Sequence, residues 1–189
     1  MNIKLKFKVE RRLGEPTIRI LVDEQMSSFD GPCPDEIELN LSIAPGDHEL
    51  RIIHYGKQHN HHEYDKHGNV VVDRHVEIVG IEFDHIKLFD HELREGEFFP
   101  VYHPDYVATA KENNVKLPYS ICPNLYLGHN GTWRLHFANP PVDWLIYKRK
   151  NMLPPTSPEW HSSERTLEVV KNYFKNAPEL DWQDIKHQN

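Results

Sequence analysis

The sequence has few cysteines, no excess of basic side chains and no long apolar run. Its 189 residues include two cysteines, Cys33 and Cys122, and the formal net charge at pH 7 is -7. This acidic balance argues against a basic nucleic-acid-binding surface. No apolar run approaches the roughly 18 residues that a membrane-spanning helix needs. We therefore expect neither a nucleic-acid partner nor a membrane partner.

The N-terminal segment also lacks the features of a secretion signal. Residues 1–13 alternate polar and apolar side chains and contain no continuous apolar stretch. We expect a strand there and no signal peptide. Without a secretory route, both thiols are expected to be reduced.

Proline, histidine and aromatic residues are what the sequence has in quantity. It contains 14 prolines and 14 histidines, and 11% of its residues are aromatic. A chain of this length can bury a sufficient core without disulfides. Its composition favours turns and strands over long helices. We expect one domain, or one domain with an appendage.

Alternating residues predict two strands near the N-terminus. Residues 3–9 alternate apolar residues with three lysines, which is typical of a half-buried strand. Lysines on the solvent face favour an edge position in the sheet. Residues 17–22 predict a second strand, and residues 29–35, with one glycine and two prolines, predict a loop.

The clearest alternation covers residues 37–43. An Ala-Pro-Gly-Asp sequence follows it, and residues 49–55 then return to a strand pattern. We predict that these two segments form an antiparallel hairpin in the main sheet. Residues 76–83 continue the strand pattern, with Ile78 and Val79 expected in the core.

A second hairpin is predicted over residues 124–137. Asn130-Gly131 is a strong signal for a type I′ turn, which needs positive φ at both positions. A two-residue turn would place Gly128 opposite Trp133, where a glycine leaves room for the indole. The same face also carries Tyr126, Leu135 and Phe137. We expect this face to be part of the core.

Residues 89–123 read as irregular, apart from a short helix at 105–113. A long structured loop inside a compact domain is uncommon and often functional. Several tyrosines lie on expected loops, namely Tyr55, Tyr102, Tyr106 and Tyr119. Such rings either stack on the apolar face of a sugar or pack over the edge of the sheet. These four are therefore candidate glycan-binding residues.

The C-terminal part has a different character. Residues 142–150 predict a short helix, a Pro-rich linker follows, and residues 163–175 predict another helix. We therefore expect a mainly β protein. It would consist of a jelly-roll-like antiparallel β-sandwich over residues 1–150 and a linker with a short helical tail over residues 151–189.

Histidines gather in the polar segment 57–69. Imidazole is a good ligand for divalent metals, and His59, His61 and His62 are candidate ligands. A specific site also needs ligands fixed by packing, which a loop tip does not supply. We expect these histidines and His67 to be exposed and without metal, with a bound divalent metal as the alternative.

Another pattern with metal-binding residue types is His103-Pro-Asp105, an H-x-D unit such as occurs in two-histidine-one-carboxylate iron sites. This unit arises easily by chance in a chain rich in histidine. The sequence has no glycine-rich phosphate loop and no G-x-S-x-G motif. We therefore expect no enzyme activity and no cofactor.

Residues 37–86 resemble the last strands of jelly-roll carbohydrate-binding modules, especially the calcium-dependent xylan-binding type. The matching residues are Gly46, His48, Leu50, Ile52, Asp73 and Arg74. The resemblance implies a sandwich that binds a glycan, and it implies that Asp73 helps to bind calcium or the ligand. Where that family has further acidic and amide ligands, this chain has Lys57, Gln58 and histidines. Calcium prefers roughly six to eight oxygen ligands.

Residues 126–137, with the two prolines and the tryptophan that follow, are similar to a motif in small proteins of tailed phages, notably those that infect cyanobacteria. This similarity implies a phage origin and a location in the virion or in the host cytoplasm. The expected function is non-catalytic glycan recognition, with a glycan or another virion protein as partner. One alternative is a virion structural or assembly protein that uses the sandwich for protein contacts. The other is a histidine-dependent metal enzyme.

Overall fold

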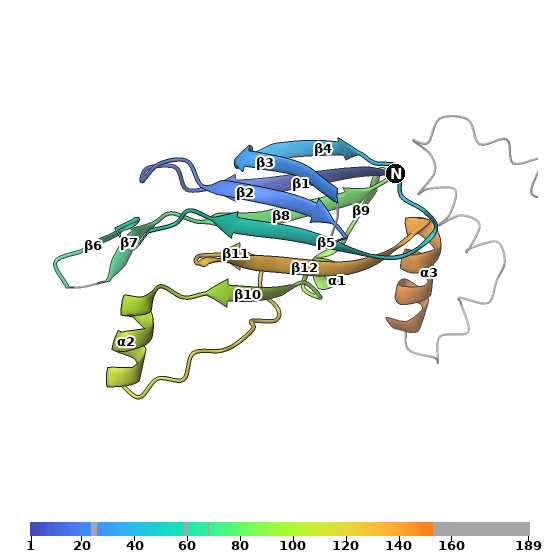
Figure 1. Cartoon of the computed structure of the whole chain (residues 1–189). Helices are drawn as coiled ribbons and strands as arrows, with labels where there is room; N and C mark the ends of the chain where they lie inside the picture. The colour runs from blue at the N-terminus through green and yellow to red at the C-terminus, as the bar shows by residue number, and fades with distance from the viewer. Residues whose placement is uncertain (24–25, 59, 68, 153–189) are drawn as a thin grey trace, which may run out of the picture. The chain divides into compact units, whose positions relative to one another are not determined.

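The structure, a computed structural model, describes residues 1–23, 26–58, 60–67 and 69–152 (Figure 1). The chain divides into two compact units, Met1–Tyr147 and Lys148–Asn189. The predicted helix at 163–175 lies outside the described residues. Among the helices of the described ranges, none is long and apolar enough to cross a membrane.

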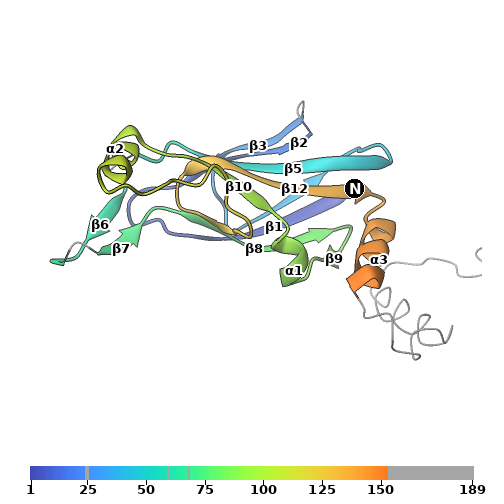
Figure 2. The same cartoon turned by 90° about the horizontal axis from the view of Figure 1, so that it is seen from below.

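Two antiparallel sheets lie face to face in the first unit (Figures 1 and 2). Sheet A has the order β11 (Tyr126–Leu127), β8 (Val76–Phe83), β1 (Asn2–Val9) and β4 (Glu36–Asn40), and β9 (Ile86–Lys87) also pairs with β8. Sheet B has the order β10 (Glu97–Val101), β12 (Asn130–Asn139), β5 (Gly46–Tyr55), β2 (Thr17–Val22) and β3 (Met26–Pro32). The predicted jelly-roll-like antiparallel β-sandwich is confirmed.

The remaining elements are short. Strands β6 (His62–Tyr64) and β7 (Val70–Asp73) pair only with each other and form what we call the β6–β7 arm. The helices are α1 (Asp90–Leu93), α2 (Pro104–Glu112) and α3 (Pro141–Met152). The helices predicted at 105–113 and 142–150 are therefore confirmed. The segment 89–123 is less irregular than expected, because it also contains α1 and β10.

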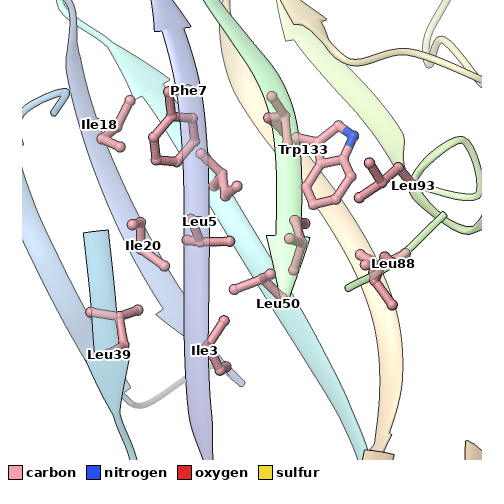
Figure 3. Packing of buried hydrophobic residues seen from close by; sticks show 14 of the residues in the cluster. Ile3, Leu5, Phe7, Ile18, Ile20, Leu39, Leu50, Leu88, Leu93 and Trp133 are labelled. Carbon is pink, nitrogen blue, oxygen red and sulfur yellow. The ribbon is translucent and has the colours of Figure 1, made fainter. Parts of the chain in front are cut away.

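Strand β1 follows its sequence pattern closely. Ile3, Leu5 and Phe7 are buried between the sheets, and Figure 3 shows their side chains in the core. The lysines on the other face pair with glutamates of the neighbouring strands, in the pairs Lys4–Glu36, Lys6–Glu82 and Lys8–Glu77. The predicted edge position is wrong, because β1 lies between β8 and β4. Lysines on a solvent face suit a central strand equally well when glutamates lie opposite.

The predicted hairpin of 37–43 with 49–55 is wrong, although both segments contain strands. Strand β4 pairs with β1 in sheet A, whereas β5 pairs with β2 and β12 in sheet B. The connection through Pro45 therefore crosses from one sheet to the other. Alternation shows that each segment buries one face, and that condition is satisfied equally by a hairpin and by a crossover.

The predicted type I′ turn at Asn130-Gly131 is also wrong. Strand β11 pairs with β8 in sheet A, and β12 already begins at Asn130 in sheet B. Gly131 has φ of +153°, and a Cβ there would lie 2.3 Å from the carbonyl oxygen of Phe99. The glycine therefore permits β10 to approach closely rather than forming a tight turn.

Burial of Trp133, Leu135 and Phe137 is as predicted. The glycine that makes room for the indole is Gly96 and not Gly128, because a Cβ on Gly96 would lie 2.0 Å from the Trp133 ring. Tyr126 was expected in the core but is 43% exposed. Its strand pairs with β8 in sheet A rather than with β12, so the Tyr126 side chain lies outside the core.

Two smaller expectations also fail. The segment 29–35 was expected to be a loop, but its first part belongs to β3, an edge strand that pairs only with β2. Proline and glycine are tolerated there because the outer side of an edge strand makes no ladder. In β8, Ile78 is buried as expected, whereas Val79 is 47% exposed because it points away from the opposite sheet.

Candidate ligand-binding cleft

An open cleft of about 830 Å³ lies at one end of the sandwich. Side chains of the β6–β7 arm and of α2 line it, and both elements extend at the same end of the sheets (Figures 1 and 2). Tyr64, Val71 and Asp73 come from the arm, Tyr106 comes from α2, and Tyr126 comes from β11. The volume falls in the range of small-molecule sites, roughly 300–1,000 Å³.

A cluster of hydrogen-bonding groups surrounds Asp73. The ammonium of Lys57 donates to Oδ1 of Asp73 and to the carbonyl oxygen of Gly128. The hydroxyl of Tyr126 donates to the other carboxylate oxygen, Oδ2, over 2.8 Å. A carboxylate has about four acceptor sites, so two of them remain for another donor. The Asp73 side chain is 21% exposed, which leaves it accessible from the cleft.

The backbone of Lys57 is fixed by the side chain of Asn130, a residue that is distant in the sequence. Its N–H donates to Oδ1 of Asn130, and its carbonyl oxygen accepts from Nδ2 of Asn130, both over 2.8 Å. Gly56, just before it, has φ of +74°, a left-handed conformation that favours glycine. The side-chain amide of Asn130 therefore holds the position from which Lys57 reaches Asp73.

Burial affects the ionisable groups of this cluster. Desolvation lowers the pKa of Lys57, and the hydrogen bond with Asp73 opposes that effect. The pKa of Tyr126 is raised, first by burial and then by its hydrogen bond to Asp73. Tyr126 therefore remains a neutral donor at physiological pH.

Other charges that line the cleft are also paired. Nζ of Lys8 lies 3.4 Å from a carboxylate oxygen of Glu77, and a guanidinium nitrogen of Arg12 lies 2.8 Å from Glu10. The hydrogen bond from Arg12 lowers the pKa of Glu10 to about 2. Each of the cations Lys8, Arg12 and Lys57 thus has a carboxylate beside it, and two of these carboxylates belong to the lining itself.

Aromatic rings gather on the α2 side. The rings of Tyr102 and Tyr106 stack with their centroids 5.7 Å apart and their planes at 16°. The imidazole of His129 lies 5.0 Å from the Tyr102 ring and 5.2 Å from the Tyr106 ring. His75 and Tyr126 also line the cleft, and their ring centroids are 4.4 Å apart. Of the predicted residues, Asp73 and Tyr106 therefore line the cleft, whereas Tyr102 packs against Tyr106 without lining the cleft itself.

The other two candidate tyrosines lie elsewhere. Tyr55 is in β5, where its hydroxyl donates to Asp30 and the guanidinium of Arg19 lies 5.7 Å from its ring. Tyr119 is 86% exposed, and its ring lies 5.7 Å from the ring of Phe99. Neither tyrosine lines the cleft. They are not brought together with Asp73.

The histidine segment is partly ordered by neighbouring side chains. His67 is exposed as predicted, whereas His61 and His62 are half-buried and not exposed. Nδ1 of His61 lies 2.9 Å from a guanidinium nitrogen of Arg74 and accepts from the backbone of Gln58. Arg74 is itself buried, which explains why the histidine beside it is covered. The candidate His59 lies outside the described residues.

The donor set around Asp73 does not fit calcium. Both carboxylate oxygens already accept hydrogen bonds, one of them from an ammonium. Calcium takes roughly six to eight oxygen ligands, whereas this cluster offers one carboxylate, one carbonyl and one phenol. Over the described ranges, there is no group of three His, Cys, Asp or Glu side chains that could hold a metal.

The H-x-D unit serves a structural role. His103 is the N-cap of α2, and its Nδ1 accepts from the backbone N–H of Asp105 over 3.3 Å. A side chain that satisfies one of the first free N–H groups stabilises the start of a helix. The spacing of two residues is thus explained by capping.

Sequence reasoning missed Lys57, Tyr126 and Asn130 as site residues. Lys57 and Asp73 are 16 positions apart, and Lys57 and Asn130 are 73 apart. No periodicity links such positions. The only signal was the resemblance, which pointed to Asp73 and placed Lys57 where that family has further ligands, but it did not indicate that the two side chains pair.

The chain is an antiparallel β-sandwich with an open, partly aromatic cleft at one end. A solved structure described as "vCBM60 in complex with galactobiose" is similar to this chain, with a TM-score of 0.43 and 12% sequence identity, over 71% of this chain and 97% of that chain. No protein-family model matches the chain, and no curated protein matches it. Galactobiose is the ligand of that other protein.

Proposed function

We propose that the chain is a non-catalytic glycan-binding module and that the cleft beside Asp73 is its binding site. One observation carries the proposal: a carboxylate with two remaining acceptor sites lies among exposed aromatic rings in an open cleft. A sugar needs acceptors for its hydroxyl groups and flat apolar surfaces for its C–H face. The cleft supplies both.

The exposed rings support this assignment. Tyr64, Tyr106 and Tyr126 all line the cleft, and they are 55%, 47% and 43% exposed, respectively. Large rings that remain this exposed have surface available for a ligand. Asp73 beside these rings would accept hydrogen bonds from sugar hydroxyls, and a charged acceptor forms stronger bonds than a neutral one.

Other ligand classes suit the cleft less well. A nucleotide or another strongly anionic ligand needs unpaired cations, whereas Lys8, Arg12 and Lys57 each have a carboxylate partner. A covalent mechanism needs an activated nucleophile, and neither Cys33 nor Cys122 lines the cleft. A neutral polyhydroxylated ligand agrees best with this lining.

A glycan array probed with the full chain tests the proposal, followed by calorimetric titration of the glycans that bind. Tyr106→Ala should weaken binding about 5-fold, because one stacked ring contributes on the order of 1 kcal/mol. Tyr147→Ala is the matched control, since Tyr147 is also exposed but does not line the cleft. An array without any bound glycan, or equal affinity of both variants, would contradict the proposal.

A protein-contact role in a phage particle is the second candidate. Val70, Val71 and Val101 lie at the cleft and are 53%, 55% and 65% exposed, which also suits a protein partner. The similarity of residues 126–137 to tailed-phage proteins supports a phage origin. In that case Val71→Glu would prevent incorporation of the chain into particles, as measured by mass spectrometry of purified phage, and the glycan array would be blank.

A further inference from the structure

A single cation joins three separate segments of the chain in the lining of the cleft. Lys57 follows β5, Asp73 ends β7, and Gly128 lies between β11 and β12. The Lys57 ammonium donates both to the Asp73 carboxylate and to the Gly128 carbonyl. An ammonium has three N–H donors, so one donor remains after these two contacts.

The ammonium is held in place by its surroundings. The lysine side chain is 11% exposed, and the amide of Asn130 fixes its backbone through two hydrogen bonds of 2.8 Å. If the ammonium left the cluster, it would lose its hydrogen bonds to Asp73 and Gly128, and the partly buried Asp73 carboxylate would lose its cation. Lys57 therefore remains in the cluster and does not swing out to solvent.

We infer that the ammonium of Lys57 takes the position that a divalent cation would otherwise fill between Asp73 and Gly128, so that the cleft organises its ligand without metal. This inference rests on the proposed glycan binding. Lys57 is a positioning residue: it fixes the carboxylate of Asp73 and the adjoining loop so that the two remaining acceptor sites face the cleft.

The charge balance of the Lys57–Asp73 pair explains why a divalent cation would not bind beside it. The ammonium and the carboxylate balance each other, and a second cation of charge +2 would meet a cluster that is already neutral. Displacing the ammonium would leave only the carboxylate, the carbonyl and the Tyr126 phenol as ligands. Such a set is far below the roughly six oxygens that calcium takes.

The first experiment needs no glycan. Full-length protein, purified without an affinity tag and dialysed against EDTA, is titrated with calcium chloride and with magnesium chloride by calorimetry. We expect no stoichiometric binding and a change in melting temperature of less than about 1 °C at millimolar metal. Stoichiometric calcium binding, or a lower melting temperature after EDTA treatment, would overturn the inference.

The second experiment tests the ammonium itself, with a glycan identified on the array. Lys57→Ala should lose glycan affinity at least 10-fold, and added propylammonium, which replaces the missing atoms, should restore it. Lys66→Met is the control, because Lys66 is an exposed lysine of the same segment that does not line the cleft. Unchanged affinity of Lys57→Ala would contradict the inference.

The two failures are distinguishable. If no glycan binds to the wild-type protein, the proposed function fails, and the metal titration still decides whether the ammonium excludes metal. If a glycan binds but EDTA abolishes binding, the proposed function holds and the inference fails. Should Lys57→Ala not fold, the EDTA and metal titrations of the wild-type protein give the answer.

Discussion

Gly96 lies directly against the indole of Trp133, so closely that a Cβ on the glycine would be 2.0 Å from Cζ2 of the ring. The ring is fully buried, and its Nε1 donates to the carbonyl oxygen of Asn124 over 2.8 Å. The indole thus has its polar atom satisfied and its edge covered by the glycine. This contact links the connection between α1 and β10 to the centre of β12.

We predict that Gly96→Ala destabilises the protein. The added methyl cannot fit without moving the indole or the backbone, and overpacking of this kind costs roughly 1–3 kcal/mol or more. Gly80→Ala is the matched control, since a Cβ there would make ordinary contacts of 3.7 Å with Lys6. Urea denaturation of the two variants measures the difference. Equal stability of both variants would show that the ring can shift freely.

Removal of the ring itself should cost more. Trp133→Ala deletes a fully buried side chain and should lower the free energy of unfolding by about 3–5 kcal/mol. Tyr119→Ala removes a ring that is 86% exposed and should change it by less than about 1 kcal/mol. Thermal melts compare the two. A small effect of Trp133→Ala would mean that the indole does not act as a core residue.

The strands could be predicted from sequence, but their partners could not. Alternation in β1, β5 and β8 reflects a local requirement, namely that one face is buried. Which sheet receives a strand depends on the direction taken by the connection, and Pro45 permits both a turn and a crossover. The Asn130-Gly131 pair gave a strong turn signal, yet the glycine is required by close contact with Phe99. In the sequence, a glycine that a tight turn needs cannot be distinguished from a glycine that a close contact between strands needs.

The candidate site was predicted only in part. Asp73, Tyr102 and Tyr106 were named from sequence, whereas Lys57 and Tyr126 were not. The contacts of these two residues join segments that are distant in the chain, so no local pattern could reveal them. Tyr126 was placed in the core because of an assumed register with β12. Its actual pairing with β8 turns the ring toward Asp73.

Acid should weaken the fold through His54. This histidine is fully buried, its Nδ1 contacts the carbonyl oxygen of His129, and its Nε2 has no hydrogen-bond partner among the residues that the structure describes. Burial lowers the pKa of His54 to about 4, below the value of about 6.5 expected in the unfolded chain. Between these two values the unfolded chain binds the extra proton, so stability falls as pH decreases from about 6.5 to about 4, by on the order of 3 kcal/mol.

Urea titrations at a series of pH values measure this effect. His54→Gln lacks the titrating ring, so its stability should depend less on pH over the same interval, even if it is lower at neutral pH. His136→Gln is the control, because the His136 side chain is 83% exposed. The interpretation fails if wild type and His54→Gln show parallel pH dependence.

The two cysteines should differ sharply in reactivity. Both are free, but Cys33 is 2% exposed whereas Cys122 is exposed. Burial raises the pKa of the Cys33 thiol to about 12, and only the thiolate attacks a disulfide reagent. The native protein should therefore release one equivalent of chromophore from Ellman's reagent rapidly, and a second only after unfolding in guanidinium. Cys122→Ser should abolish the rapid phase, and Cys33→Ser should leave it intact. Two rapid equivalents in the native wild-type protein would mean that β3 opens readily at its Pro32 end, because that opening is what would expose the Cys33 thiol.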